Sequence, residues 1–321
     1  MTDTPLITIG ITCHDAAGTV ARAVGSALAQ NWKNFEIVIV DDASTDGASL
    51  ILQSLAAQHP RIRVLTNIKN GGVAVSRNRI VEEARGEFIV FFDDDDESVP
   101  ERLYRQYRRI TDYERKFANG AFVICHTART QSYPYGVVRY EPTMGTDENV
   151  CAPHGEAVAE RILTGRPVPG VFGSIATCSQ MARTEIYRDL GGFDPAFRRG
   201  EDTDLNIRAA LKGAHFVGIS DPLVIQTMTL TGDKKLDEEC ASNLRLLKKY
   251  QVFVSEKLSY SFCCRWIEAK YDFIAGRRAK FMIAIFKLLF CHPAATLKRA
   301  VWALPNIGFN VRIRRFYNEA K

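Results

Sequence analysis

The sequence predicts an α/β fold, with a mostly parallel sheet flanked by helices and followed by a helical extension. Over the first hundred residues, short apolar runs alternate with segments whose apolar residues recur at helical spacing. Strands that are apolar throughout are buried on both faces, which is typical of parallel sheets covered by helices. Beyond about Gly232 the pattern becomes helical and amphipathic. We therefore expect a first domain over residues 1–231 and a basic helical extension over residues 232–321.

Each predicted element rests on its local composition. Strands are expected where β-branched and aromatic residues cluster, at residues 6–12, 35–40, 62–65 and 87–92. Helices are expected over residues 19–30, 48–59 and 72–85, and Pro60 and Gly86 directly follow the last two. Residues 133–171 are rich in Gly, Pro and polar side chains without clear periodicity, so we expect a long loop or an insertion beside the functional site.

The cysteines and the apolar runs bear on the cellular compartment. The eight cysteines form no C-x-x-C pair and no zinc-type spacing, so we expect reduced, mostly buried thiols. Residues 1–11 lack the basic region and the long apolar run of a signal peptide. The longest apolar stretch, residues 281–291, is well short of the ~20 residues that a spanning helix needs. We expect a cytoplasmic protein.

Charge is distributed unevenly along the chain. The net charge is +5, but residues 265–321 hold 12 Lys/Arg against 3 Asp/Glu. A basic segment of this kind favours an anionic surface as its partner. Nucleic acid is not expected, because no recognised binding module accompanies the basic residues.

The basic segment is also apolar, which suggests contact between residues 277–321 and an anionic membrane. We expect one face of a single helix to carry five of its apolar residues, and four aromatic residues alternate with Lys and Arg further on: Phe273, Phe281, Ile285, Leu288 and Leu289, then Trp302, Phe309, Phe316 and Tyr317. An interfacial helix on the inner face of the cytoplasmic membrane has this composition. Packing of the same residues on the first domain or on another subunit is the alternative.

Four consecutive acidic residues, Asp93, Asp94, Asp95 and Asp96, follow the fourth predicted strand. Ligands of parallel sheets bind beyond the carboxyl ends of the strands. Neighbouring carboxylates repel one another unless they face open water or share a cation, and oxygen ligands suit Mg²⁺ or Mn²⁺. In an extended segment Asp93 and Asp95 would point the same way. The alternative is a solvated acidic turn that caps the helix expected to start at Pro100 and Glu101.

Three blocks of the chain resemble family 2 glycosyltransferases of the bacterial polysaccharide type, which have a GT-A fold. The blocks are residues 27–47 (ALAQNWKNFEIVIVDDASTDG), 70–100 (NGGVAVSRNRIVEEARGEFIVFFDDDDESVP) and 191–208 (GGFDPAFRRGEDTDLNIR). Their order and spacing follow the family pattern, and the resemblance covers roughly residues 6–225. No GxGxxG motif follows the first strand, which disfavours a dinucleotide oxidoreductase.

The resemblance implies a site for a nucleotide-diphosphate sugar, typically a UDP-sugar. The residues that would bind this donor are Thr12, His14, Asp15, Asp42, Arg77, Asp93 and Asp94. Asp42 would accept a hydrogen bond from the base, and Arg77 would touch the base or the phosphates, with Asn78 supporting the loop. From the residues alone, His14 could instead be a packed histidine, Asp42 part of a helix-capping cluster, and Arg77 a solvated helix charge.

The resemblance also implies the metal ligands and the catalytic acid. Asp95 would be the principal ligand of Mn²⁺ or Mg²⁺, and Asp93 a ribose or metal contact. Many family members have a further histidine ligand, but residues 222–232 contain none. Asp202 would be the catalytic base, with Glu201 beside it, although both could simply be first-turn acids favoured by a helix dipole. A neutral sugar hydroxyl is a poor nucleophile, so a proton acceptor at this position fits the chemistry.

The function implied is an inverting transfer of the sugar to a hydroxyl of a glycan or of a lipid-linked saccharide. One alternative is transfer to polyprenyl phosphate, whose oxygen is already anionic and needs no base. A second alternative is an inactive family member that serves as a binding or scaffold subunit, which the intact Asp42, Asp95 and Asp202 disfavour.

Overall fold

The computed structural model describes residues 4–133, 136–228 and 236–304. The chain forms two compact units. The first comprises residues 1–159 and 169–228, and the second comprises residues 160–168 and 229–321. The predicted boundary between residues 231 and 232 lies outside the described residues.

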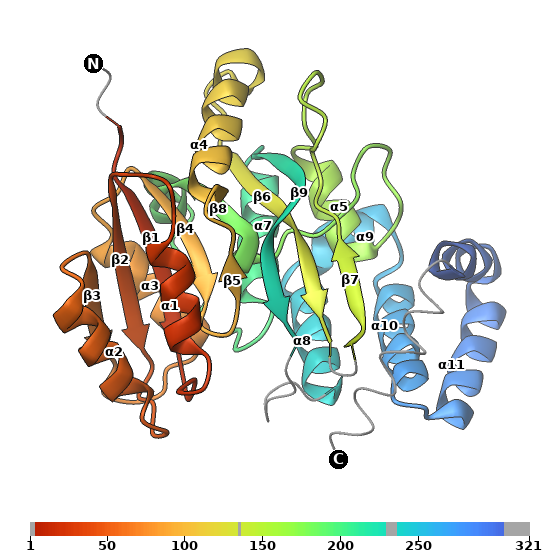
Figure 1. Cartoon of the computed structure of the whole chain (residues 1–321). Coiled ribbons are helices and arrows are strands. Elements are labelled where there is room, and N and C mark those ends of the chain that lie inside the picture. The colour runs from red at the N-terminus through yellow and green to blue at the C-terminus, as the bar shows by residue number, and fades with distance from the viewer. Residues whose placement is uncertain (1–3, 134–135, 229–235, 305–321) are drawn as a thin grey trace. The chain divides into compact units, whose positions relative to one another are not determined.

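The first unit contains a sheet in the order β3-β2-β1-β4-β8-β6-β9-β5, with β7 paired to β6 (Figure 1). Strands β1 to β4 are mutually parallel where they pair, and β8 runs antiparallel to both β4 and β6. The strands are β1 (Ile7–Cys13), β2 (Phe35–Asp41), β3 (Ile62–Thr66), β4 (Phe88–Asp93), β5 (Glu97–Ser98), β6 (Val123–Ser132), β7 (Val138–Glu141), β8 (Gln180–Arg183) and β9 (His215–Thr227). The four strands predicted in the first hundred residues are confirmed, and so is the α/β class.

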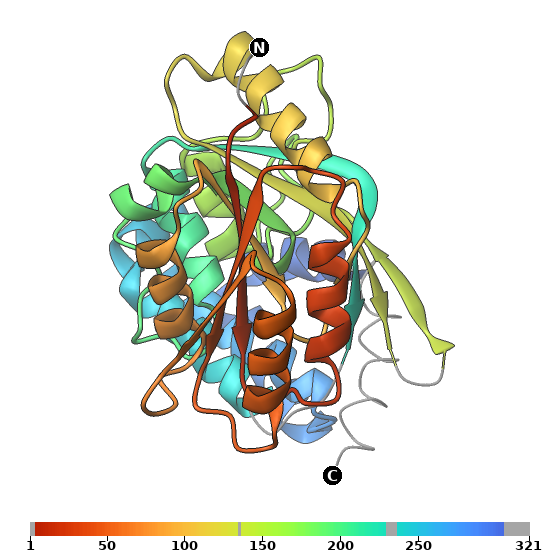
Figure 2. The same ribbon diagram turned by 60° about the vertical axis from the view of Figure 1, so that its left-hand side comes forward.

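Helices cover both faces of this sheet. Helices α1 (Val20–Leu28) and α2 (Ala48–Gln58) lie on one face and α3 (Val73–Glu83) on the other, as Figure 2 shows. The chain moves from β1 outward to β2 and β3 and then returns to β4 on the other side of β1. Right-handed crossovers place helices on opposite faces when the direction of the strand order reverses. The reversal beside β1 marks the point where ligands bind in open α/β sheets.

The remaining helices of the first unit follow β5 and lie between the later strands. They are α4 (Arg102–Tyr113), α6 (Thr184–Asp189) and α7 (Glu201–Leu211), and α5 (Glu156–Thr164) begins in this unit. Residues 133–171, predicted as a loop or insertion, contain β7 and α5, so the prediction of an irregular segment was only partly right. Val138 and Tyr140 of β7 are exposed, so the apolar residues of this four-residue strand do not mark a core face.

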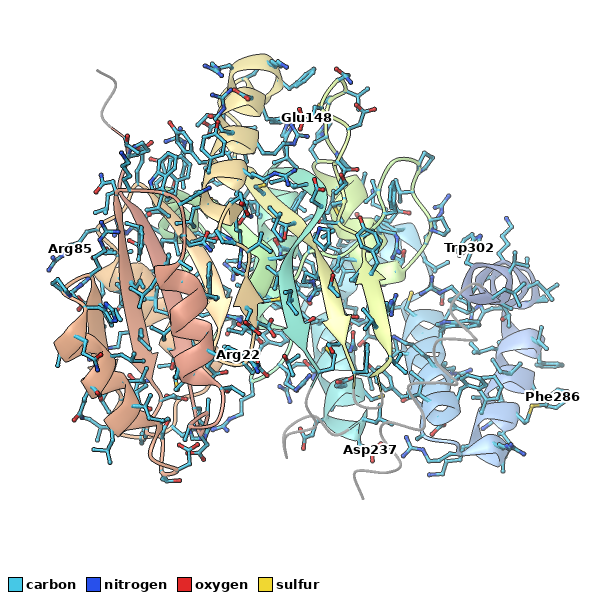
Figure 3. All side chains as sticks on the ribbon, in the orientation of Figure 1. Arg22, Arg85, Glu148, Asp237, Phe286 and Trp302 are labelled. Atoms are coloured by element: carbon cyan, nitrogen blue, oxygen red, sulfur yellow. The ribbon has the colours of Figure 1, made fainter. Side chains whose placement is uncertain are left out.

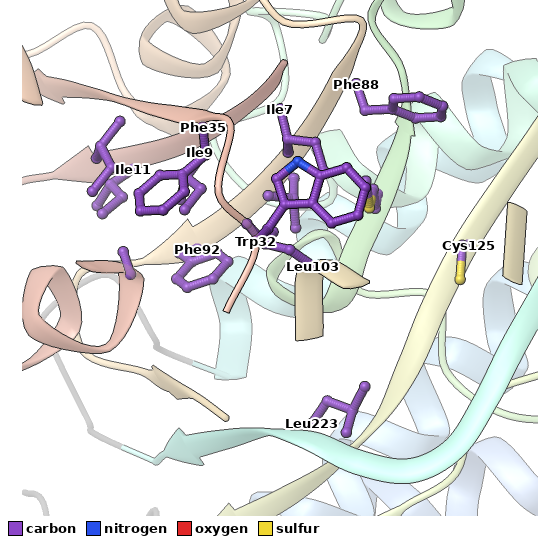
Figure 4. Packing of buried hydrophobic residues seen from close by; sticks show 14 of the residues in the cluster. Ile7, Ile9, Ile11, Trp32, Phe35, Phe88, Phe92, Leu103, Cys125 and Leu223 are labelled. Carbon is purple, nitrogen blue, oxygen red and sulfur yellow. The ribbon is translucent and has the colours of Figure 1, made fainter. Parts of the chain in front are cut away.

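The core of the first unit lies between the parallel strands and α4. Ile7, Ile9 and Ile11 are fully buried along β1. Figure 4 shows the Trp32 indole beside them, and its ring centroid lies 4.8 Å from that of Tyr107. Packing at this density fixes β1 relative to its neighbours, so the loops at its carboxyl end start from a rigid base.

The second unit is helical, with α8 (Leu236–Lys249), α9 (Gln251–Lys257), α10 (Tyr260–Ile274) and α11 (Arg278–Cys291). Gly276 has φ 74° and follows the end of α10, so the chain turns before α11 begins. The prediction that Phe273 shares one helix with Phe281 was therefore wrong: the two rings meet across this turn at 5.3 Å. None of the helices within the described ranges has the length and apolarity that crossing a bilayer requires.

All eight cysteines are free, as predicted. The expectation that most of them are buried was wrong, because only four of the eight are buried. Cys13, Cys125, Cys178 and Cys263 are buried, whereas Cys151 and Cys291 are exposed.

Arg102, the first residue of α4, is a charged residue buried in the core of the first unit. Its side chain is fully buried and donates to the Ser98 hydroxyl at 2.9 Å, to the Gln106 amide oxygen at 3.0 Å and to the Phe91 carbonyl at 3.0 Å. Burial lowers its pKa to about 10. The guanidinium therefore links the end of β4, the short strand β5 and the first turn of α4.

Replacing Arg102 by alanine should lower the free energy of unfolding by about 3 kcal/mol, because three buried acceptors lose a charged donor. Denaturant unfolding followed by circular dichroism measures this loss. Arg108→Ala is the matched control, because Arg108 lies on the exposed side of the same helix and should contribute less than about 0.5 kcal/mol. Equal losses in the two variants would contradict the role given to Arg102.

Candidate active site

The carboxyl ends of β1, β2 and β4 meet at one edge of the sheet. Thr12 on β1 is half-buried and lies opposite Val40 of β2 and Asp93 of β4. The loops that carry the other predicted donor-binding residues leave from this edge. The structure thus brings Thr12, His14, Asp42 and Asp93 together from segments up to eighty residues apart.

Two polar residues, His14 and Asp15, hold the loop after β1 in place. The His14 main-chain N–H donates to Asp94 at 3.0 Å, and Asn70 Nδ2 lies 2.8 Å from His14 Nε2. The His14 side chain is exposed, which is against the interpretation as a packed core histidine. Asp15 has φ 49° and accepts a hydrogen bond from the Thr45 main-chain N–H at 2.7 Å, which lowers its pKa.

Asp42 anchors the loop that leads into α3. Its buried carboxylate accepts hydrogen bonds from Asn67 Nδ2 at 2.7 Å and from the main-chain N–H groups of Gly71 and Gly72 at 2.9 and 2.7 Å. The first turn of α2 is capped by Asp46, which accepts from the Ala48 N–H at 3.0 Å. Asp42 is therefore not the cap of α2. A carboxylate offers about four acceptor positions, so Asp42 retains capacity for one more donor.

The acidic segment after β4 is a turn. Asp94 and Asp95 occupy the turn, and the Asp96 N–H lies 3.4 Å from the Asp93 carbonyl. The prediction that Asp93 and Asp95 share one direction assumed an extended chain, whereas residues 94 and 95 form a turn. Burial, with repulsion from Asp95 and Asp93, raises the pKa of Asp94 to about 7. Burial and the charges of Asp93 and Asp95 also raise the pKa of Asp96.

Arg77 joins this acidic turn to the second acidic pair. One guanidinium nitrogen donates to Glu201 Oε1 at 2.6 Å and the other lies 3.3 Å from Asp93 Oδ1. The side chain is 7% exposed and lies over the rings of Phe91 and Phe193. Burial opposes its charge, but Glu201, Asp93 and Asp202 outweigh that effect and raise the pKa of Arg77. Arg77 is thus an internal bridge and not a solvated helix charge.

Asn78, the next residue of α3, holds the turn that precedes α7. Its amide donates to the Phe193 carbonyl at 2.8 Å and accepts from the Phe193 N–H at 2.7 Å. Arg208 on α7 donates to the Gly192 carbonyl at 2.7 Å. Gly192 has φ 70°, and a Cβ there would lie 2.4 Å from Asn78 Oδ1. The loop that Asn78 supports is therefore the one leading to Glu201 and Asp202.

Glu201 and Asp202 begin α7 but face different surroundings. Glu201 is buried against Arg77, whereas Asp202 is half-buried and accepts from the Thr203 N–H at 2.6 Å. Burial and the neighbouring Asp202 raise the pKa of Glu201 to about 7, although Arg77 opposes the shift. Both acids lie in the first turn of α7, where the helix dipole favours negative charge. Asp202 is the more accessible of the two carboxylates.

The acidic turn fits a hard divalent cation. Asp93, Asp96 and Cys178 offer ligand atoms that all lie within 4.8 Å of one another. Asp96 Oδ2 is buried without a hydrogen-bond partner among the described residues. Burial raises the pKa of Cys178 to about 12, so its thiol stays protonated and the carboxylates are the donors. Carboxylate oxygens are the ligands that Mg²⁺ and Mn²⁺ prefer.

Sequence reasoning missed Asp96 and Cys178 as neighbours of Asp93. Asp96 could have been found from the four-residue spacing of a turn, whereas nothing in the sequence places Cys178 there. Asp95, predicted as the principal metal ligand, is not in this group, and its main-chain carbonyl accepts from Arg22 at 3.1 Å. A cavity of about 300 Å³ along α4 is lined by none of the predicted site residues.

The structure predicts a pH dependence of stability that involves Glu201. Its folded pKa of about 7 lies above the ordinary value of 4.5, so its contribution to stability is fully present below pH 4.5 and is lost as the pH rises through 7. Glu201→Gln should reduce this fall by on the order of 2 kcal/mol, measured by urea unfolding at a series of pH values. Glu82→Gln, at an exposed site on α3, should leave the slope unchanged. The same slope in both variants would contradict the assignment.

Comparisons with known proteins agree with this geometry. The putative glycosyltransferase EpsE of Bacillus subtilis is 30% identical over 229 residues, which is 70% of this chain and 73% of that protein. TarS 1–349 of S. aureus, in complex with UDP-GlcNAc, superposes with a TM-score of 0.59 at 17% identity, covering 88% of this chain and 80% of that one. The mannosyltransferase PcManGT of Pyrobaculum calidifontis, in complex with GDP-Man and Mn2+, gives 0.58 at 15% identity, covering 99% and 85%.

The two superpositions confirm the predicted GT-A fold, since identities this low inform on the fold alone. The family model described as Glycosyl transferase family 2 matches residues 8–178. The matched segment includes the carboxyl ends of β1, β2 and β4 and the acidic turn. The chain is a glycosyltransferase that belongs to glycosyl transferase family 2.

Proposed function

We propose that the protein transfers a sugar from a nucleotide-diphosphate sugar, a UDP-sugar by preference, to a hydroxyl of a glycan or lipid-linked saccharide, with inversion at the anomeric carbon. The observation that carries this proposal is the Arg77 bridge, which joins Asp93 of the acidic turn to Glu201 beside Asp202. A transferase needs a site for the diphosphate and a proton acceptor within reach of one sugar. The Arg77 bridge holds the acidic turn and the Glu201–Asp202 pair in one site, which supports a diphosphate site and a proton acceptor close to each other.

The donor would bind at the carboxyl edge of the sheet. Thr12, His14 and Asp15 lie at the end of β1, and Asp42 can accept one more hydrogen bond, which suits the N–H of a uracil base. Arg77 already contacts two carboxylates, so its role toward the donor would be to hold Asp93 in place. The neighbours bound to UDP-GlcNAc and GDP-Man support a nucleotide-sugar donor and leave uracil and guanine to be distinguished by experiment.

The carboxylates of the acidic turn would hold Mn²⁺ or Mg²⁺, with Asp93 and Asp96 as ligands beside the predicted Asp95. When bound, the cation neutralises the negative charge that gathers on the leaving diphosphate. Asp94 would contribute negative charge and orient His14, to whose main-chain N–H it is bonded. The neighbour in complex with GDP-Man and Mn2+ supports this choice of metal.

Asp202 would act as the general base. Glu201 is occupied by Arg77, whereas Asp202 is half-exposed and free of that bridge. Asp202 would take the proton of the acceptor hydroxyl as its oxygen attacks the anomeric carbon opposite the nucleotide, and the diphosphate would leave with the bonding electron pair. A phosphate acceptor is already anionic and would need no base, so the acid at this position favours a hydroxyl acceptor.

Asp202→Asn should lower kcat by at least about 100-fold, because the acceptor hydroxyl loses its proton acceptor. Donor binding should be unchanged, since Asp202 lies on the acceptor side. The measurements are transfer assays with a panel of UDP- and GDP-sugars and the rise in melting temperature that UDP with Mn²⁺ produces.

The matched control is Asp189→Asn, an exposed aspartate at the end of α6, which should behave as wild type. Normal turnover by Asp202→Asn would exclude Asp202 as the base. No shift of the melting temperature with any nucleotide would count against donor binding.

We also propose that the second unit contacts an anionic membrane surface, where a lipid-linked acceptor would reside. On α11, Met282, Ile283, Phe286 and Phe290 are exposed, Phe290 to 90%, and Figure 3 shows Phe286 projecting from the helix. On the predicted apolar face of the same helix, Leu288 is instead fully buried. Exposed Lys280 and Lys287 accompany the outer face, and basic residues beside exposed aromatic ones suit anionic lipid. The predicted residues Phe309, Phe316 and Tyr317 lie outside the described residues.

Replacing both Phe286 and Phe290 by serine should weaken binding to phosphatidylglycerol vesicles by at least about tenfold, because two apolar rings no longer enter the interface. Vesicle co-sedimentation measures this affinity, and vesicles of neutral lipid should bind the wild type less. Ile68→Ser removes a still more exposed apolar residue of the first unit and should have no effect. Equal binding by wild type and the double variant would exclude α11 as the contact.

A further inference from the structure

A second cluster of metal-ligating side chains lies at the opposite end of the strands from the acidic turn. Cys151, His154 and His215 offer ligand atoms that all lie within 4.8 Å of one another. His215 is the first residue of β9, and β9 runs parallel to β6. The cluster therefore lies at the amino end of β9, in the upper part of the first unit in Figure 1, whereas the acidic turn follows the carboxyl end of β4.

The two sulfur–nitrogen distances in the cluster are close to those around a bound zinc-class ion. Cys151 Sγ lies 3.8 Å from His154 Nδ1 and 3.8 Å from His215 Nδ1. Tetrahedral coordination with Zn–S of about 2.3 Å and Zn–N of about 2.0–2.1 Å requires a sulfur–nitrogen separation of about 3.6 Å. Both sulfur–nitrogen distances lie within a few tenths of an ångström of this value, and one of the two stacked rings would turn so that both nitrogen lone pairs, which lie in the ring planes, point to the ion.

The backbone around the cluster is already held in place. The Phe216 N–H donates to the Pro153 carbonyl at 2.8 Å, and the Gly155 N–H donates to the Ala214 carbonyl at 3.3 Å. His154 and His215 also pair as an isolated antiparallel β-bridge. The His154 and His215 rings stack with their centroids 4.4 Å apart. Ligands on a fixed backbone bind a metal without the cost of ordering a loop.

Tyr113 completes the surroundings of the cluster. Its hydroxyl accepts from the Ala152 N–H at 2.9 Å and lies 2.6 Å from His215 Nδ1 and 3.5 Å from Cys151 Sγ. Because the Ala152 N–H donates to it, the hydroxyl hydrogen can point to His215 Nδ1, which is then unprotonated. Binding of a metal at that nitrogen would redirect the hydroxyl hydrogen to the sulfur, and such outer hydrogen bonds tune thiolate ligands.

Both histidines can supply a neutral nitrogen. Burial and the neighbouring His154 lower the pKa of His215. His154 Nδ1 lies 2.9 Å from the Ala152 carbonyl, so it carries the hydrogen there. Its ring is exposed, so the hydrogen can move to Nε2 and be solvated when Nδ1 binds a metal.

We propose that Cys151, His154 and His215 form a structural site for a borderline-soft divalent cation of the zinc class, distinct from the hard-cation site at the acidic turn. One sulfur and two imidazole nitrogens select Zn²⁺ or Co²⁺ over Mg²⁺ and Mn²⁺. A water molecule would take the fourth position. The ion would tie residues 151–154 to the start of β9. The C-x-x-H spacing of Cys151 and His154 signals this site, which a search for cysteine pairs does not find.

The test uses the full-length chain, stripped of metal by a chelator and titrated with Co²⁺. A thiolate-to-cobalt charge-transfer band should saturate at one equivalent, and Zn²⁺ should displace it and raise the melting temperature. Cys151→Ser should abolish the band, and His154→Ala should weaken Co²⁺ binding at least tenfold. Both side chains are exposed, so circular dichroism should show that the variants fold.

Two control variants locate the sulfur. Cys291→Ser removes the other exposed cysteine, and Cys178→Ser removes the thiol beside Asp93 and Asp96; both should retain the band. Absence of the band in the wild type, or a band that survives Cys151→Ser, would overturn the proposal. Cobalt bound at the acidic turn through oxygen alone would give no thiolate band, so it could not be mistaken for this site.

Discussion

The buried contact of Arg77 with Asp93 and Glu201 is the interaction on which the rest of the site depends. A guanidinium is the one side chain that can bind two carboxylates in fixed directions while staying charged at any physiological pH. Without it, two acidic segments more than a hundred residues apart in sequence would repel each other across a poorly hydrated space. The favourable contacts on both sides of Arg77 outweigh the cost of burying its charge. Arg77 therefore both stabilises the fold and holds the acidic side chains of the site together.

The site divides into two halves with different construction. The half proposed to bind the donor consists of loops that bind one another through carboxylates and main-chain N–H groups, as Asp42 does with Gly71 and Gly72. The half proposed to face the acceptor consists of a turn fastened to α3 by Asn78 and to α7 by Arg208. The division explains why the predicted acids differ in environment. Asp42, which organises the backbone, is buried and accepts three hydrogen bonds, whereas Asp202 is more accessible.

The sequence was sufficient for β1 to β4 and α1 to α3, because fully buried parallel strands have a strong apolar signal and Pro60 and Gly86 mark helix ends. It was insufficient for β7, whose pairing with β6 is decided by tertiary contact, and for the turn at Gly276 that separates α10 from α11. In the site, the motifs identified the acids but not their partners. That Arg77 faces Glu201 and that Cys178 lies beside Asp93 are long-range contacts, which local patterns do not encode.

Helix α3 has a consequence for how the two halves can move. Its leading glycines are held by Asp42, Arg77 reaches Asp93 and Glu201, and Asn78 fastens Phe193. Successive residues leave an α-helix about 100° apart around its axis. Arg77 and Asn78 therefore leave α3 in different directions, so a rotation of the helix about its axis would disturb both sets of contacts at once.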